Sequence, residues 1–398
     1  MKEGWEYKKL GAVADFYRGL TYKREDEVDS SDNCVLRSNN IDLESMSLNF
    51  NELKYIKQDF IIPEEKKLKA NSVFVCMSNG SKQHVGKVAY IKDNMDYAFG
   101  GFMGLIVPKR VIEGKYIYYI CRSSLYRQFL TQIGNGIGIT NLRFSDLNNF
   151  SLPIPPLSEQ QHIVEELDLL SSIIEKKKAQ LNELDNLAQS LFYEMFGNPI
   201  SNEKGWDKNV LNEVAKVTSS KRILQSEWQE AGIPFYKVAD IVNLINGECV
   251  TPLTFIKETT YNELKSNGLV PKANDVLITS RGTIGQCYIV KEHDSFYFQD
   301  GMITWLSNIN SLISPTFLVA LFANDVFSDS LKHSANSSTV AYISIKQLSN
   351  MKIPIPPLTL QQQFASKIEA IEHQKELIKQ SIKEVETLFN SRMDYYFN

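Results

Sequence analysis

The sequence of 398 residues lacks the features of several common classes of protein. It has five cysteines but no Cys-x-x-Cys pair, and its five histidines are scattered without the spacing of metal ligands. We therefore expect no metal site and no disulfide framework, only free thiols in a reducing compartment. No apolar run reaches the roughly 18 residues of a membrane helix, and the start MKEGWEYKK is unlike a signal peptide. These absences predict a cytoplasmic protein that does not enter a membrane.

Catalytic signatures are missing as well. The sequence has no GxxxxGK[ST] phosphate loop, no Asn/Asp-Pro-Pro-aromatic quartet of amino-methyltransferases, and no Gly-rich turn between a strand and a helix. The segment 134–138 (GNGIG) is similar to such a turn, but the second half of the chain does not keep its glycines, so we interpret it as a flexible loop. We find no pair of carboxylates and no Ser/His/Asp set that indicates catalysis. We expect a chain that is not an enzyme and binds no cofactor of its own.

The chain also lacks an excess of basic residues, with a net charge of −4. Residues 1–152 carry a net charge of +3 and residues 201–353 carry −1, while the stretches 153–200 and 354–398 together carry −6. A stand-alone DNA-binding domain usually carries a basic stripe. Two alternatives remain: the globular parts do not bind nucleic acid, or a partner supplies much of the phosphate contact.

What the chain does contain is an internal repeat with an offset of 201 residues. The segment 153–157 (PIPPL) returns at 354–358, and Gly4-Trp5 returns as Gly205-Trp206. This period is too long for a solenoid and fits one domain plus one long helix. We therefore expect four parts: a globular domain over 1–152, a helix over 153–200, a second domain over 201–353 and a second helix over 354–398.

Each PIPPL segment is followed by a predicted helix. Ser158–Gln161 and Thr359–Gln362 fit the Ser/Thr-x-x-Gln capping box that begins helices. The sequence Gly197-Asn198-Pro199 ends the first helix, because a C-cap glycine followed by proline cannot continue it.

Both helices carry apolar residues in a 4-3 heptad, which is typical of a coiled-coil seam. Only Lys177, Lys375 and Arg392 interrupt it. Such a stripe also fits an amphipathic helix lying on its own domain, but two matched stripes in one chain favour pairing. The linkers favour an antiparallel coiled coil of roughly 48 Å, at about 1.5 Å per residue, with an internal pseudo-twofold. The residues predicted at this helix interface are Leu167, Leu170, Ile174, Leu181, Leu184, Leu191, Ile368, Ile371, Ile378, Ile382, Val385 and Phe389.

The globular halves are expected to mix helices and strands. Two pairs of β-rich runs, 73–77 with 87–91 and 276–279 with 286–290, each enclose a polar turn with a glycine. Segments 116–133 and 315–330 are predicted helices. The polar loops 134–138 and 336–339 lead into short helices before each PIPPL segment. The expected fold class is α+β: two similar mixed α/β domains joined by a pair of long helices.

The junctions resemble those of one known family. The pattern I-P-hydrophobic-P-P-L-x-x-Q-Q before a heptad helix, the sequence LFYEMFGNP at 191–199 and the restart Lys204-Gly205-Trp206 resemble the DNA-specificity subunit of type I restriction-modification systems. The resemblance covers both repeats. The second copy departs from the pattern at Thr359-Leu360, where the first has Ser158-Glu159.

This resemblance implies that the two domains are target recognition domains, each reading one half of a split sequence in double-stranded DNA. It implies that the helices dock two methyltransferase subunits, which hold S-adenosylmethionine and methylate adenine N6, and that motor-nuclease subunits join for restriction. The alternative is a non-catalytic scaffold whose paired domains bind proteins or glycans.

Base recognition in the major groove uses polar and charged side chains at loop tips. If the two domains read different half-sites, we expect the turn that both domains contain to carry different side chains in each. The predicted base-reading region is therefore the turn at 78–84 and its counterpart at 279–283, and four other basic residues are candidates for phosphate contact. The candidate DNA-binding residues are Arg37, Ser78, Asn79, Lys82, Gln83, Arg143, Lys237, Ser280, Arg281, Thr283 and Lys346.

Overall fold

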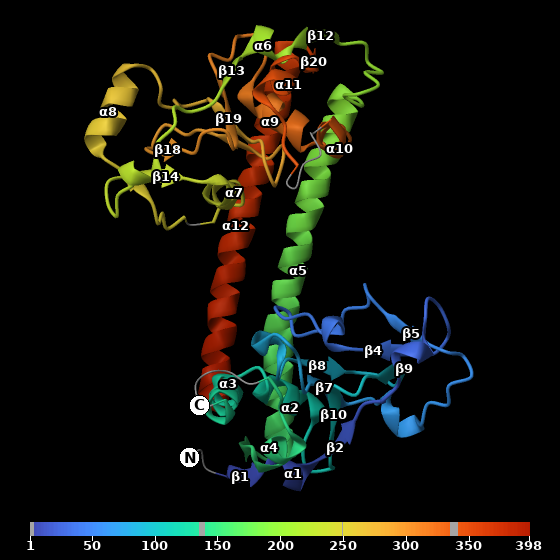
Figure 1. Cartoon of the computed structure of the whole chain (residues 1–398). Coiled ribbons are helices and arrows are strands. Elements are labelled where there is room, and N and C mark those ends of the chain that lie inside the picture. Colours follow the sequence, from blue (N-terminus) through green and yellow to red (C-terminus); the bar gives the residue numbers. More distant parts are fainter. Residues whose placement is uncertain (1–3, 135–139, 249, 335–340) are drawn as a thin grey trace. The chain divides into compact units, whose positions relative to one another are not determined.

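The computed structural model describes residues 4–134, 140–248, 250–334 and 341–398. Its contacts divide the chain into two compact units. Unit 1 contains Met1–Lys178 and Lys379–Asn398, and unit 2 contains Ala179–Ile378. Each unit therefore holds one globular repeat, the beginning of the long helix that follows it, and the end of the other long helix (Figure 1).

The centre of unit 1 is a four-stranded antiparallel sheet of order β2-β10-β7-β8. Helix α2 packs on β7, β8 and β10 (Figure 1). A five-stranded sheet of order β3-β5-β4-β9-β6 lies beside the four-stranded one, and its pair β4 and β9 is parallel. The bounds are β1 Glu6–Lys9, α1 Leu10–Val13, β2 Ala14–Arg18, β3 Glu27–Val28, β4 Cys34–Leu36, β5 Lys54–Ile56, β6 Lys67–Leu68, β7 Ser72–Cys76, β8 Val88–Ile91, β9 Met95–Phe99, β10 Met103–Pro108, α2 Gly114–Ile120, α3 Ser124–Ile133, α4 Phe144–Asn149 and β11 Ser151–Ile154.

Unit 2 repeats this arrangement. Its four-stranded sheet has the order β13-β19-β16-β17, and a smaller sheet of order β15-β14-β18 contains the parallel pair β14 and β18. The bounds are β12 Asp207–Val210, α6 Leu211–Val214, β13 Lys216–Thr218, β14 Ile233–Tyr236, α7 Val238–Ile245, β15 Phe255–Ile256, α8 Glu258–Ser266, β16 Val276–Thr279, β17 Cys287–Ile289, β18 Tyr297–Phe298, β19 Ile303–Ser307, α9 Pro315–Ala323, α10 Asp325–Ser334, α11 Ile345–Ser349 and β20 Lys352–Ile355. The predicted pair of similar mixed α/β domains is confirmed.

The predicted hairpins β7–β8 and β16–β17 are present, and both faces of their sheets are covered. In β7, Val73 and Val75 belong to the core beneath the helices, whereas Phe74 and Cys76 belong to the core facing the second sheet. This two-sided burial explains why the run VFVCM is continuously apolar instead of alternating.

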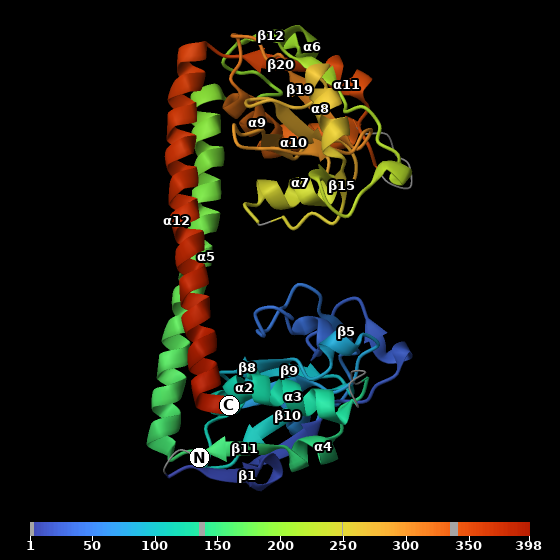
Figure 2. The same cartoon turned by 90° about the vertical axis from the view of Figure 1, so that its left-hand side faces the viewer.

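The long helices are α5 (Leu157–Phe196) and α12 (Leu358–Phe397). Within each unit they lie side by side and run antiparallel (Figure 2). In unit 1 the Arg392 guanidinium binds the Glu166 carboxylate and Lys178 lies 3.5 Å from Glu386. In unit 2 the Lys375 ammonium lies 2.8 Å from the Asp185 carboxylate. The predicted antiparallel pairing is confirmed, and two residues that interrupt the heptad make ion pairs between the helices.

The twelve predicted helix-interface residues are all buried or half-buried. The end of each helix also enters the core of a globular domain, which the heptad did not predict. Phe192 and Phe196 pack with Phe364 in the core of unit 2, and Met393 and Phe397 lie in the core of unit 1. The two interpretations of the stripe, a seam and a helix on a domain, therefore both hold, each for a part of the helix.

The predicted capping boxes are wrong. Helix α5 begins at Leu157, so Ser158 is already inside its first turn, and the Pro156 carbonyl accepts the N–H groups of Glu159 and Gln160. The residue before each helix is a proline, which lacks the N–H group that a capping box would donate to the side chain three residues later, so the reciprocal bonds cannot form. Helix α12 begins in the same way at Leu358.

A fully buried glutamine fixes each of these junctions instead. The Gln160 side-chain oxygen accepts the Glu113 N–H at 3.0 Å, and its nitrogen donates to the carbonyls of Val111 and Pro155 at 3.2 and 2.9 Å. Gln361 makes the same three bonds 201 positions later, with Ser314, Leu312 and Pro356 at 2.8, 2.9 and 2.8 Å. These bonds tie the helix start to the chain before α2 or α9.

Some sequence predictions need qualification. The helix predicted over 116–133 is divided into α2 and α3, and the helix predicted over 315–330 is divided into α9 and α10. Cys34, Cys76, Cys121 and Cys287 are buried free thiols, as expected. Cys249, residues 135–138 of the first predicted loop and all of the second, 336–339, lie outside the described residues.

Candidate nucleic-acid interface

In unit 1, three segments meet at one corner of the four-stranded sheet. The turn after β7 forms an isolated bridge from Ser78 to Asn141, and the Leu142 N–H donates to the Met77 carbonyl at 2.7 Å. The Phe102 carbonyl, before β10, accepts the N–H groups of Met77 and Ser78 at 2.9 and 3.1 Å. We call this group of segments, residues 77–79, 101–102 and 140–143, the unit 1 corner.

Unit 2 builds the same corner from residues 280–282, 301–302 and 341–343. Arg281 forms an isolated bridge to Tyr342, and the Ile343 N–H donates to the Ser280 carbonyl at 2.9 Å. The Ser280 N–H in turn donates to the Met302 carbonyl at 2.8 Å. The main chain of the two corners is therefore equivalent, while the side chains differ.

These bonds set the correspondence between the two turns. Ser280 takes the position of Met77, and Arg281 takes the position of Ser78, although both turns read Ser-x-Gly in the sequence. Met77 and Ser280 are accordingly both buried, with 7% and 4% of their surface exposed. The Ser280 hydroxyl lies 2.6 Å from the Thr304 hydroxyl inside the protein. Ser280 is the one predicted DNA-binding residue whose side chain is buried.

The other predicted residues lie on or near these corners. Asn79 belongs to the unit 1 corner, and its side-chain nitrogen donates to the Ser38 hydroxyl at 2.8 Å. Arg143 is exposed at the start of α4. Arg37 and Lys237 are half-buried and each directly precedes a short helical segment, 38–40 or α7. Lys82, Gln83, Thr283 and Lys346 are exposed on the turns or on α11.

The Lys237 ammonium lies 4.6 Å from the centre of the Trp228 ring, which holds the cation at the surface through a cation–π contact. The structure thus brings Ser78, Asn79 and Arg143 to one corner and Arg281 to the other, with Lys346 on the helix that follows the second corner.

A cleft of about 220 Å³ opens beside the unit 1 corner. Three residues that line it are not among the DNA-binding residues predicted from the sequence: Arg18 at the end of β2, the exposed Phe102 and the exposed Asn141. The Arg18 Nε donates to the Gly101 carbonyl at 3.2 Å. The sequence signals these residues only indirectly, because the segments around β2 and β10 can be aligned with the corresponding segments of the second repeat.

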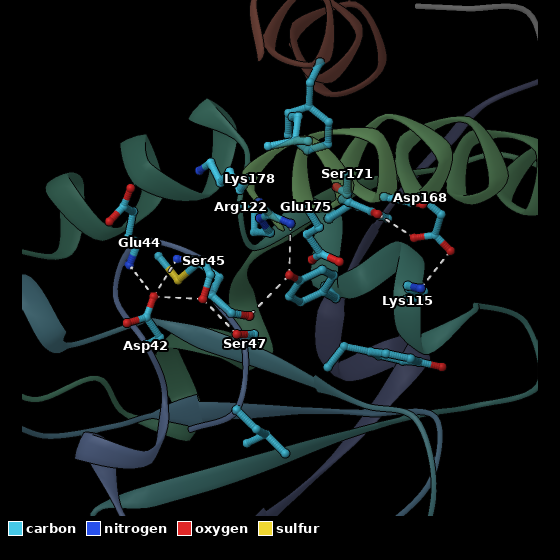
Figure 3. Close-up of a pocket in the computed structure, with 18 of the residues that line it drawn as sticks. Asp42, Glu44, Ser45, Ser47, Lys115, Arg122, Asp168, Ser171, Glu175 and Lys178 are labelled. Carbon is cyan, nitrogen blue, oxygen red and sulfur yellow. Dashed lines mark hydrogen bonds and ion pairs between the residues drawn. The ribbon is translucent and has the colours of Figure 1, made fainter. Parts of the chain in front are cut away.

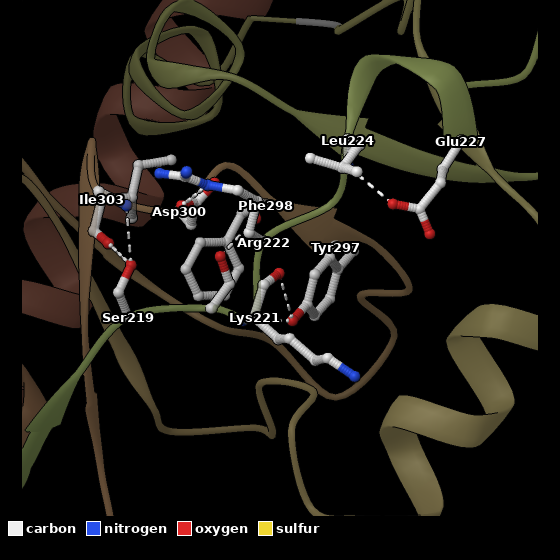
Figure 4. A network of polar contacts seen from close by, with 11 residues as sticks. Ser219, Lys221, Arg222, Leu224, Glu227, Tyr297, Phe298, Asp300 and Ile303 are labelled. Carbon is white, nitrogen blue, oxygen red and sulfur yellow. Dashed lines mark hydrogen bonds and ion pairs between the residues drawn. The ribbon is translucent and has the colours of Figure 1, made fainter.

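In unit 2 the register of the strands puts Ser219, directly after β13, in the place of Arg18, and the chain that follows carries Lys221 and Arg222. Figure 4 shows how it is held: the Lys221 N–H donates to the Tyr297 hydroxyl at 2.8 Å, and the Arg222 guanidinium binds the Asp300 carboxylate at 2.8 Å. The Ser219 hydroxyl donates to the Ile303 carbonyl and accepts the Gly301 N–H. One exposed cation, Arg222, therefore borders the unit 2 corner, and it is paired with a carboxylate.

A larger hollow of about 1000 Å³ lies elsewhere in unit 1, between residues 42–50, α2 and the long helices (Figure 3). Several of its side chains bind one another: Lys115 lies 2.7 Å from Asp168, and the Arg122 guanidinium donates to the Tyr118 hydroxyl and packs on Phe389. Burial, followed by the hydrogen bond to Asp168, raises the pKa of Tyr119, which keeps the phenol protonated. These contacts tie α2 to α5 and α12.

Two buried cysteines of unit 1 have raised pKa values. Burial raises the pKa of the Cys76 thiol to about 11 and that of the Cys121 thiol to about 12, so neither supplies a thiolate near neutral pH. Among the described residues, no three or more His, Cys, Asp or Glu side chains are grouped to hold a metal ion. In the same part of the chain, every helix is too short or too polar to cross a membrane.

Comparison with known proteins matches two stretches of the chain, residues 2–186 and 203–387, to the family described as the type I restriction modification DNA specificity domain. The chain is 23% identical over 391 residues to the EcoKI specificity subunit of Escherichia coli K12, covering 93% of this chain and 82% of that protein. It is 25% identical over 414 residues to the StySPI specificity subunit of Salmonella potsdam, covering 98% and 87%.

Two solved structures share the fold. The S subunit of the type I restriction-modification system from M. genitalium aligns with a TM-score of 0.56 at 14% identity, covering 99% of this chain and 96% of that one. A chain from a study of complex assembly and conformational transition of the type I restriction-modification system aligns with a TM-score of 0.57 at 18% identity, covering 99% and 97%.

Proposed function

The chain belongs to the family of type I restriction-modification DNA specificity subunits, and from this premise we propose that it reads an asymmetric DNA target in two separate halves and brings a methyltransferase to it. As a specificity subunit it recognises DNA sequence and is not itself the catalyst. This membership favours DNA recognition over the alternative of a scaffold for proteins or glycans.

The observation that carries the proposal is the corner built twice with different side chains. Equivalent hydrogen bonds hold Ser78 in unit 1 and Arg281 in unit 2 at the same place. A serine and an arginine offer different hydrogen-bonding groups, and arginine pairs with the O6 and N7 atoms of guanine. Two corners with one backbone and different side chains suit two readers of different sequences.

We propose residues 1–152 and 201–353 as the two target recognition domains. Within them, Ser78, Asn79, Lys82, Gln83, Arg281 and Thr283 are the proposed base-reading candidates, and Arg37, Arg143, Lys237 and Lys346 are the proposed phosphate contacts. Ser280 is left out because its hydroxyl is bonded inside the protein. The half-buried Arg37 and Lys237 fit phosphate positioning better than base reading, since each lies at the start of a short helix and not on a turn of the central hairpin.

The long helices are the proposed docking surface for two methyltransferase subunits. Leu187 and Leu388 are exposed, at 46% and 49%, on the outer faces of α5 and α12, and they are repeat equivalents that belong to different units. Equivalent apolar residues, one in each unit, suit two copies of the same partner. The related chain with a TM-score of 0.57 comes from work on complex assembly of a type I system.

In this proposal the methyltransferase subunits hold S-adenosylmethionine and methylate adenine, and motor-nuclease subunits join them in the cytoplasm for restriction. The near-neutral charge of the globular domains fits a division in which the partner supplies part of the phosphate contact.

The direct test is binding of a pool of random duplexes by the chain with its methyltransferase subunits, followed by sequencing of the bound DNA at increasing salt. We expect enrichment of a split motif with unread positions between its halves, and affinity that falls as salt rises. Binding without enrichment of any sequence would contradict sequence recognition by this chain. Enrichment of one uninterrupted motif would contradict the two-reader proposal.

A further inference from the structure

We propose that Phe102 is a specificity-determining residue of unit 1, whose ring makes an apolar contact with the 5-methyl group of a thymine, while Arg18 and Arg143 hold the neighbouring DNA backbone. This inference rests on the proposed function and adds to it a residue and a chemical group on the DNA. Phenylalanine is one of the side chains that contact the thymine methyl group in the major groove.

Phe102 has an exposed side chain on a fixed backbone. Its surface is 70% exposed, and the ring belongs to none of the hydrophobic clusters formed by the described residues. The Phe102 carbonyl nevertheless accepts two N–H groups, from Met77 and Ser78. An exposed apolar residue is common by itself, so the argument depends on its fixed position and on its neighbours.

The chain on either side of Phe102 is held in place by β2 and the residues after it. The Gly19 N–H donates to the Met103 carbonyl at 3.2 Å, and the Leu20 N–H donates to the Phe99 carbonyl at 2.6 Å. Gly19 comes so close to Gly100 that a Cβ atom on it would lie 2.0 Å from the Gly100 carbonyl oxygen. A tip ordered in this way loses little conformational entropy when it binds a ligand.

The surroundings of Phe102 are cationic. Arg18 and Arg143 line the same cleft, together with the polar side chains of Ser78 and Asn141, and no Asp or Glu lines it among the described residues. Neither arginine has a carboxylate within ion-pair distance in the described part of the chain. An apolar ring that lines the same cleft as two guanidinium groups without carboxylate partners suits a ligand with both phosphate charge and a methyl group, which a thymidine in duplex DNA provides.

Unit 2 lacks this combination. Met302, which takes the place of Phe102, is half-buried and packs against the core of its unit. The Arg222 guanidinium near it binds Asp300. The exposed ring and the unpaired arginines are therefore no part of the shared fold, as expected for side chains that distinguish one half-site from the other.

The test combines substitutions in protein and DNA. The chain with its methyltransferase subunits is titrated with duplexes of its own target in which each thymine of the two halves is replaced in turn by uracil, which lacks only the methyl group. We expect one replacement to weaken binding by the wild-type protein roughly three- to tenfold. Phe102→Ala should weaken binding to the thymine duplex by a similar factor and bind the uracil duplex no more weakly than the thymine one.

Met302→Ala is the matched control and should keep the wild-type response to that uracil. Equal melting temperatures of Phe102→Ala and the wild type exclude misfolding as the cause. Failure of the wild-type complex to select any sequence would contradict the proposed function itself. If it selects a sequence, three results overturn the Phe102 inference: a half-site without an A·T pair, no methyl-sensitive thymine, or equal sensitivity in Phe102→Ala. Equal loss of affinity for the thymine and uracil duplexes is the third of these results, and it would indicate insertion of the ring between bases or contact with a protein partner instead.

Discussion

Arg281 holds in unit 2 the position that Ser78 holds in unit 1, because each residue bridges from the turn of its central hairpin to the segment before a short helix. The matching Ser-x-Gly letters place Arg281 opposite Asn79 instead, one residue away. The two units therefore present different chemical groups from one backbone position, and this relationship leads to the first prediction.

Replacement of Arg281 by alanine should relax reading of one half of the target only. If the guanidinium makes a bidentate contact with guanine, binding should weaken by about 1–3 kcal/mol for that half. The check is the bound motif of the variant, compared with Lys291→Ala, which removes an exposed cation after β17. Equal changes in both halves would contradict separate readers, whereas no change at all would reject only the role of Arg281.

Replacement of Gln160 by leucine should destabilise unit 1. The change leaves the Glu113 N–H and the carbonyls of Val111 and Pro155 without their partner in a buried place, at a cost of about 2–4 kcal/mol. Urea unfolding followed by hydrogen exchange in α5 measures the loss. Gln161→Leu, the exposed neighbour, is the control and should change stability by less than about 0.5 kcal/mol. Similar stability of the two variants would show that the buried glutamine is not needed.

Replacement of Leu184 by aspartate should weaken the pairing of the long helices. Leu184 is half-buried in the apolar seam, and an aspartate there would hold a carboxylate without a cation of its own, because Lys375 is already bound by Asp185; this costs about 2 kcal/mol or more. Small-angle scattering should show altered dimensions, and assembly with the methyltransferase should fail. Leu187→Asp, on the exposed face, should impair assembly alone. Unchanged scattering and unchanged assembly for Leu184→Asp would reject the seam.

The Glu166–Arg392 pair predicts a pH-dependent contribution to stability. Hydrogen bonding to Arg392 lowers the pKa of Glu166 in the folded chain. Its contribution is therefore complete above the unfolded pKa of about 4.3 and is lost as the pH falls through the lower folded value. Because both side chains are about one third exposed, we expect no more than about 1 kcal/mol. The free energy of unfolding of Glu166→Gln should lie below that of the wild type at pH 7 and approach it near pH 3. If the two free energies of unfolding differed by the same amount at pH 7 and pH 3, the ion pair would not be the source of the pH dependence.

The repeat, the two domains and the antiparallel helices could be predicted from the sequence, because an offset repeat and a heptad are periodic signals. The burial of four residues at the helix ends could not be predicted. Phe192 and Phe196 pack on the domain that follows them in the chain, and Met393 and Phe397 pack on the domain of the first repeat. The start of α5 was misplaced because Ser158 fits a capping box, while Pro156 already supplies the acceptor for the first turn.

The corners could be predicted only in part. Ser78, Asn79 and Arg281 lie in turns that the alternation of apolar and polar segments marks clearly. Phe102 and Arg18 occur in ordinary stretches of sequence, and their exposure results from the packing of β2, β7 and β10. The one-residue difference between the two turns hid the equivalence of Ser280 with Met77, which only the hydrogen bonds reveal.

Recognition of two different half-sites by the two units can be measured by mapping methylated adenines in DNA from cells that express this chain with its methyltransferase subunits. Two corners with one backbone and different side chains predict a single asymmetric motif, in which two short and different specified sequences flank a stretch of fixed length that can be any sequence. A continuous motif, or a palindromic one with two identical halves, would contradict recognition of two different half-sites by the two units.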